Sequence, residues 1–154
     1  EGSGPLVHAQ WEVALALGVF GVEAACSAEL RGREYINTQE VLAEFAEHTP
    51  PAALVGGPPV AVVAHPDHAW RCWAMVTLAG YSAVVPDLAS AAADQFCWEA
   101  HGCDFEGYDE GSVQAHTRSR DAFAPYERRL QDSIMERHGP ALLRRPNTMQ
   151  SIPE

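Results

Sequence analysis

Apolar residues recur at intervals of three and four positions from Ala9 to Arg31. That spacing puts them on one side of a helix, so the pattern predicts a first helix with one buried face over this range. Gly32 follows directly, and glycine often ends a helix because it readily adopts the left-handed conformation. The predicted buried stripe consists of Trp11, Leu15, Val19, Val22 and Cys26.

A second helix is predicted from Gln39 to His48. Thr38 precedes it and is the predicted N-cap, because its hydroxyl can accept a hydrogen bond from a free amide of the first turn. Thr49 and two prolines end the helix. The glycine- and proline-rich residues 56–59 predict a connector within one domain rather than a domain boundary. The apolar face of this helix comprises Val41, Leu42 and Phe45.

The valine-rich run from Val60 to Ala64 fits either a buried strand or the start of a helix, and we favour the strand. A third helix is predicted from His68 to Ala79, with Asp67 as its cap and Gly80 as its stop. Its inward residues are predicted to be Trp70, Trp73 and Val76.

Two further helices follow in the pattern. Tyr81 to Val85 is interpreted as a short hydrophobic turn, after which Pro86 begins a fourth helix that runs from Asp87 to about His101. The last helix is predicted from Ser112 to His138, with a bend at Pro125, because glycine and proline come next.

Together these elements predict a mostly α fold, a single-domain helical bundle of about five helices that also contains one or two short strands at most. An α+β fold is the alternative. The globular domain is expected to span residues 9–140. Residues 1–8 are expected to be a disordered or expression-derived N-terminus, and residues 141–154 a C-terminal tail.

Composition narrows the classes of partner. The chain has a formal net charge of −11 and no lysine, which disfavours a nucleic-acid binder because such proteins present a basic face to phosphates. It has no apolar run of about 18 residues, so no membrane span is expected. It also has no leader pattern, which favours a cytoplasmic location, and exclusive use of arginine is typical of a GC-rich bacterial genome.

Two short runs hold most of the residues that could bind a metal ion. A strand that ends at Ala64 would present a histidine and an aspartate at its edge, and the next helix would add a histidine and a cysteine one turn apart. Zinc accepts such nitrogen, sulfur and oxygen ligands. In the alternative interpretation these residues are helix caps and surface groups. The candidate ligands are His65, Asp67, His68 and Cys72 in the first run and Cys97, His101 and Cys103 in the second.

Aromatic residues supply a candidate ligand-binding surface. Trp70, Trp73 and Tyr35 could line a pocket for a small apolar ligand, although tryptophans at helical spacing usually belong to a core. We identify no catalytic residue from sequence. The acidic pairs and the arginine-rich run from Arg118 to Arg129 are interpreted as solvated faces, with Glu127 as a local partner of the arginines.

The segment AELRGREYINTQEVL, residues 28–42, resembles the N-terminal repeat domain of Clp-type AAA+ chaperones. The resemblance implies a non-catalytic helical domain that binds peptides, adaptors or small ligands. No Walker A motif occurs in the chain, so ATP hydrolysis is not expected. The matching positions are Ala28, Gly32, Tyr35, Ile36, Thr38 and Leu42.

The segment VAVVAHPD, residues 60–67, resembles the zinc-binding loop of LmbE-like zinc de-N-acetylases. The resemblance implies that His65 and Asp67 bind zinc. His68 stands where that family has a second aspartate, which serves as its general base. This difference weakens the implied catalytic role.

Two functional hypotheses therefore remain. The first is a non-catalytic helical module that binds a peptide, a partner protein or a small apolar ligand. The second is a small metal-dependent hydrolase that uses zinc held by His65, Asp67 and His68.

Overall fold

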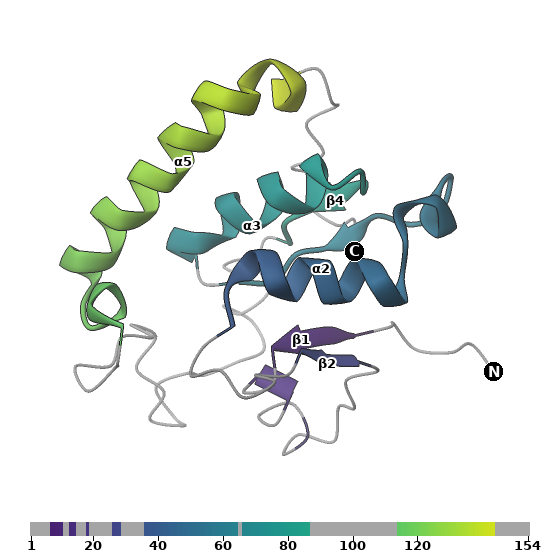
Figure 1. Cartoon of the computed structure of the whole chain (residues 1–154), viewed down its shortest axis with the longest axis horizontal. Coiled ribbons are helices and arrows are strands. Elements are labelled where there is room, and N and C mark those ends of the chain that lie inside the picture. The colour runs from purple at the N-terminus through teal and green to yellow at the C-terminus, as the bar shows by residue number, and fades with distance from the viewer. Residues whose placement is uncertain are drawn as a thin grey trace. The chain divides into compact units, whose positions relative to one another are not determined.

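The computed structural model describes residues 7–10, 13–14, 18, 26–28, 36–64, 66–86 and 114–143. These residues are mostly helical with few strands, which confirms the mostly α class, whereas the number of five helices is not confirmed (Figure 1). The chain divides into two compact units, Glu1–Pro58 and Pro59–Glu154, and the division falls inside the predicted connector. Each unit is described separately below.

The first unit contains two short parallel strands. β1 (His8–Gln10) pairs with β2 (Cys26–Ala28), with His8 opposite Cys26. The prediction of one continuous helix from Ala9 to Arg31 was therefore wrong at both ends. Parallel strands need a long connection between them, and the apolar spacing of residues 11–25 belongs to that connection. Periodicity in an apolar run does not show where a helix begins or ends.

Helix α2 (Thr38–His48) packs against both strands of the first unit. Its N-cap is Asn37, whose side-chain oxygen accepts hydrogen bonds from the amides of Gln39 (2.9 Å) and Glu40 (3.1 Å). The Glu40 carboxylate in turn accepts one from the Asn37 amide at 2.8 Å, which completes a capping box. Thr38, the predicted cap, is instead the first helical residue. A 3-10 helix, η1 (Pro51–Leu54), follows α2.

The second unit begins with a strand, a helix and a parallel strand. β3 (Val60–Ala61) pairs with β4 (Ala83–Val84), and α3 (Pro66–Leu78) connects them. The strand predicted over 60–64 is thus confirmed for its first two residues. Tyr81–Val85 was wrongly interpreted as a turn, because it contains β4. Short apolar segments fit a turn or a strand equally well until a pairing partner is known.

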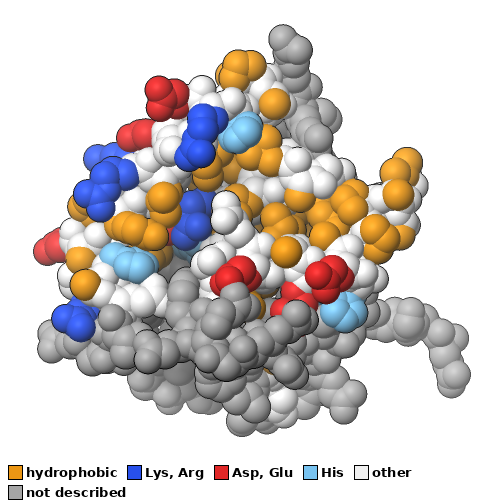
Figure 2. Space-filling model, in the orientation of Figure 1, with side chains coloured by type: hydrophobic (Ala, Val, Ile, Leu, Met, Phe, Trp, Pro, Cys, Tyr) orange, Lys and Arg blue, Asp and Glu red, His pale blue; other side chains and the backbone are white. Residues whose placement is uncertain are grey.

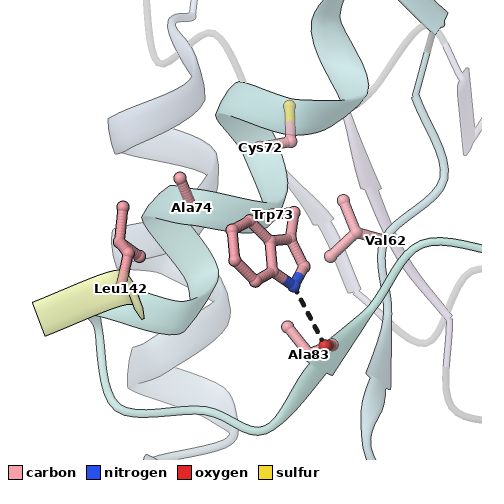
Figure 3. Packing of buried hydrophobic residues seen from close by; sticks show 6 residues of the cluster. All are labelled: Val62, Cys72, Trp73, Ala74, Ala83 and Leu142. Carbon is pink, nitrogen blue, oxygen red and sulfur yellow. Dashed lines mark hydrogen bonds between the residues drawn. The ribbon is translucent and has the colours of Figure 1, made fainter. Parts of the chain in front are cut away.

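The core of the second unit lies between α3, the β3–β4 sheet and the end of α5 (Figure 3). The indole nitrogen of Trp73 donates a hydrogen bond to the carbonyl of Ala83 at 3.1 Å, so this large side chain is buried with its polar atom satisfied. Gly80, with φ of 103°, ends the turn after α3 as the sequence predicted. The buried cluster comprises Val62, Cys72, Trp73, Ala74, Ala83 and Leu142.

The long helix α5 (Arg120–Leu143) packs along α3 and is preceded by a 3-10 turn, η3 (Ala115–Thr117) (Figure 1). The predicted range Ser112–His138 was wrong at both ends. Ser119, rather than Ser112, caps the helix, because its hydroxyl accepts a hydrogen bond from the Ala122 amide. At the other end the helix continues through Pro140, and Leu142 is buried in the core. Burial of Leu142 offsets the hydrogen bond that the proline removes.

Several predicted features lie outside the described residues. These are the fourth helix, most of the connection in the first unit and the predicted tail beyond Leu143. Within the part of the chain that the structure describes, none of the helices combines the length and the apolar character needed to cross a membrane.

Candidate functional site: the charged contact between α3 and α5

Glu127 is the most deeply buried charged residue of the described chain, with 1% of its surface exposed. Its carboxylate accepts two hydrogen bonds from Arg71, from Nε to Oε2 and from Nη2 to Oε1, both at 2.8 Å. Nδ1 of His68 lies 3.2 Å from Oε1. His68 and Arg71 are three residues apart on α3 and therefore share a helix face. We call these three residues the Glu127 cluster.

Glu127 and Arg71 are both ionised at neutral pH. Burial alone would raise the pKa of Glu127, but hydrogen bonds from His68 and Arg71, together with their charges, lower it to about 2. Burial alone would lower the pKa of Arg71, but the hydrogen bond to Glu127 and the charge of that carboxylate raise it. An ionised carboxylate only accepts hydrogen bonds, so Nδ1 of His68 carries the proton that points toward Oε1. The arrangement is a bidentate ion pair with a supporting imidazole.

A second ion pair joins the first turns of the same two helices. Arg120 donates from Nε to Oδ2 of Asp67 at 3.1 Å and from Nη2 to Oδ1 at 3.3 Å. The Arg120 side chain is exposed, so water and salt weaken this pair and its contribution to stability is small. It is a second contact between the two helices, near Asp67.

Aromatic rings surround these ion pairs. His116 of η3 stacks on Tyr126 of α5, with ring centres 4.0 Å apart and an interplanar angle of 21°. Phe123 contacts the rings of both His116 and His68, at 6.2 and 6.3 Å between ring centres. The rings connect η3, α5 and α3 beside the Glu127 cluster.

The described candidate metal ligands have other partners. Asp67 binds Arg120, and His68 binds Glu127. Cys72 is buried in the core, and burial raises its pKa to about 11, so at neutral pH it is a thiol rather than the thiolate that binds metals. No three described histidine, cysteine, aspartate or glutamate side chains form a group that could hold a metal ion.

The remaining candidates, His65, Cys97, His101 and Cys103, lie outside the described residues, as does Tyr35. The predicted zinc site therefore stays a prediction. Trp73 belongs to the core, whereas Trp70 is half-buried beside it, with the two ring centres 6.4 Å apart.

Sequence reasoning missed the Glu127 cluster. We interpreted Glu127 as a partner of arginines on an exposed face, but it is buried and pairs with α3. A signal was present, because Glu127 is four residues after Phe123 and seven before Ile134, and so shares the inward stripe of α5. Arg71 had no comparable signal, since arginines on half-buried helix faces are common.

No protein-family model, curated protein or solved structure matches this chain. The resemblances of residues 28–42 and 60–67 to known families consequently stay predictions. The functional argument rests on the residues themselves.

Proposed function

We propose that this protein is a non-catalytic binding module whose second unit binds an apolar peptide or protein segment. The observation that carries the proposal is an exposed valine two residues after strand β3, among the described residues. Val62 is 8% exposed and lies in the core, whereas the next residue, Val63, is 68% exposed. Ala61, on the same side of the chain as Val63, is also exposed.

Parallel sheets are rarely left with one bare face. Their strands usually carry apolar residues on both faces, each covered by helices. Here α3 packs against one face, whereas Ala61 in β3 and Val63 just beyond it are exposed on the other side of the chain. Other apolar side chains at the surface of the described residues are visible among the charged ones in Figure 2. A bound apolar segment would remove Val63 from water, which favours association.

The charged residues of the second unit support a binding role rather than acid–base chemistry. Glu127 has a pKa of about 2, far below the range in which a carboxylate exchanges protons efficiently near neutral pH. Cys72, with a pKa of about 11, is a poor nucleophile at the same pH. Glu127 joins α5 to α3 and Cys72 packs in the core, so both contribute to structure, as a rigid binding scaffold requires.

The test compares two exposed valines in the full chain. Val63→Asp alters the proposed surface, and Val55→Asp makes the same change at a valine of the first unit that is 85% exposed. Peptides are first selected from a random displayed library against the unaltered chain, and their Kd values are then measured by fluorescence anisotropy. We expect Val63→Asp to weaken binding about tenfold or more, because burial of a valine contributes about 1.5 kcal/mol or more.

Two results would overturn the proposal. Either no peptide is enriched, or the enriched peptides bind both variants as tightly as the unaltered chain. Circular dichroism of each variant establishes that a loss of binding does not reflect unfolding.

The zinc hydrolase stays the alternative prediction, and none of the described contacts favours it. Metal content measured by plasma mass spectrometry on untagged protein, with His65→Ala and Cys97→Ala variants, tests it directly. Near-stoichiometric zinc that is lost in either variant would move the assignment toward a metalloenzyme or a metal-stabilised fold.

A further inference from the structure

The outer edge of β3 carries main-chain groups that the β3–β4 ladder does not use. The amides of Val60 and Val62 donate to main-chain carbonyls of residues 82–84, both at 2.8 Å. Main-chain groups along a strand point alternately to its two sides, so the amides and carbonyls of Ala61 and Val63 point away from β4. Among the described residues, none of the hydrogen bonds involves these groups. They form an unpaired strand edge.

This edge is open to water, whereas the edge of β4 is closed. Ala61 and Val63 are both exposed. On the other side of the sheet, the carbonyl of Ala83 points away from β3 and accepts a hydrogen bond from the indole nitrogen of Trp73 at 3.1 Å (Figure 3). Ala83 is 4% exposed, so no further strand can approach it. Only the β3 side of the described sheet can therefore accept another strand.

The two ends of this edge limit its length. Pro59 has no amide to donate, and helix α3 begins at Pro66. The usable edge is thus the stretch from Val60 to Ala64, which matches one strand of ordinary length. Unpaired edges of this kind pair readily with an extended segment of another chain. The main-chain hydrogen bonds then provide affinity, and alternate side chains provide specificity.

We propose that the outer edge of β3 binds an extended, basic segment of a partner protein, which adds to the sheet as a third strand. The inference rests on the peptide-binding function proposed above and adds how the peptide is held. An apolar, β-branched residue of the segment would lie beside Val63, where such cross-strand pairs are favourable. The formal net charge of −11 favours arginine or lysine on either side of that residue.

The first test modifies the peptide and leaves the protein unaltered. A peptide enriched against the full chain in the selection described above is synthesised with one N-methylated amide at each position in turn. N-methylation removes a hydrogen-bond donor and adds bulk between paired strands. We expect Kd to rise at least about fivefold at alternate positions and to change little at the positions between them, because only every second residue of an added strand faces β3.

The second test removes one donor from the protein edge. Ala61→Pro deletes the outward amide of β3 without deleting a hydrogen bond to β4, whose partners are Val60 and Val62. Ala61→Ser is the matched control, because it changes the side chain and keeps the amide. Peptide affinity should fall at least about fivefold in Ala61→Pro and less than about twofold in Ala61→Ser. Circular dichroism of both variants establishes that they are folded.

The outcomes separate this inference from the proposed function. If no peptide is enriched, both are wrong. If binding depends on Val63 but N-methylation lacks the alternating pattern, peptide binding stands and the added strand is overturned. The N-methyl series decides the question if Ala61→Pro fails to fold. Added salt should weaken binding of the basic segment, and an affinity that salt leaves unchanged overturns the assignment of a basic partner.

Discussion

Arg71 of α3 and Glu127 of α5 form a bidentate ion pair, with both donor–acceptor distances at 2.8 Å, in a region where the carboxylate has almost no contact with solvent. The pair joins two helices through residues that are 56 positions apart in the sequence. A lone charge in this position would be very unfavourable, so each residue depends on the other. This mutual dependence makes the pair a sensitive reporter of the α3–α5 contact.

Replacement of Glu127 by Gln should lower the free energy of unfolding by about 3 kcal/mol, because it leaves the Arg71 guanidinium buried without a counter-charge. Glu136→Gln, on the exposed side of the same helix, serves as the control and should change the free energy by less than about 0.5 kcal/mol. Urea denaturation measures both. Equal effects of the two substitutions would show that the pair is not a specific contributor to stability.

The lowered pKa of Glu127 predicts that the folded chain loses stability in acid. The pKa of Glu127 falls from 4.5, its ordinary value, to about 2 in the folded chain. The unfolded state therefore takes up a proton first as the pH drops. The stability that Glu127 contributes is complete above about pH 4.5 and is lost as the pH falls toward 2. Urea midpoints measured between these pH values should decrease, and the decrease should be smaller in Glu127→Gln.

The sequence predicted local helices more successfully than tertiary contacts. α2 and α3 were located to within a few residues, because their apolar spacing and flanking glycine and proline residues are local signals. The strands were harder to predict from the sequence. β4 has two residues, and its identity depends on pairing with β3, which no local pattern reveals. The C-terminal end of α5 was missed because packing of Leu142 outweighed the effect of a proline.

The candidate site also shows that a sequence predicts local structure better than tertiary contacts. Asp67, His68 and Cys72 were selected because their side-chain chemistry and spacing suit a metal. Two of them instead bind α5, and Cys72 is part of the core. A sequence shows which groups could bind, whereas the partner that they meet depends on residues more than 50 positions away.

The lowered pKa of His8 predicts that the stability of the first unit depends on pH near neutrality. Its folded pKa lies below the ordinary 6.5, mainly because of burial. A histidine with a lowered folded pKa contributes stability that is present above its unfolded value and is lost as the pH falls below it. Acidification from pH 7 through 6.5 and lower should therefore destabilise the first unit. Hydrogen exchange of the α2 amides measures this effect, and a His8→Phe variant with an unchanged pH profile would contradict it.

The end of α5 offers a comparison between adjacent leucines. Leu142 is 4% exposed and lies in the core, whereas Leu143 is 79% exposed. Leu142→Ala should lower the free energy of unfolding by about 2–4 kcal/mol, because it removes apolar contacts and leaves a cavity. Leu143→Ala should change it by less than about 0.5 kcal/mol, since its side chain is already in water. Both values follow from urea denaturation. A similar small effect at both positions would mean that the helix ends before Pro140 in solution, because only a helix that continues through this proline brings Leu142 into the core.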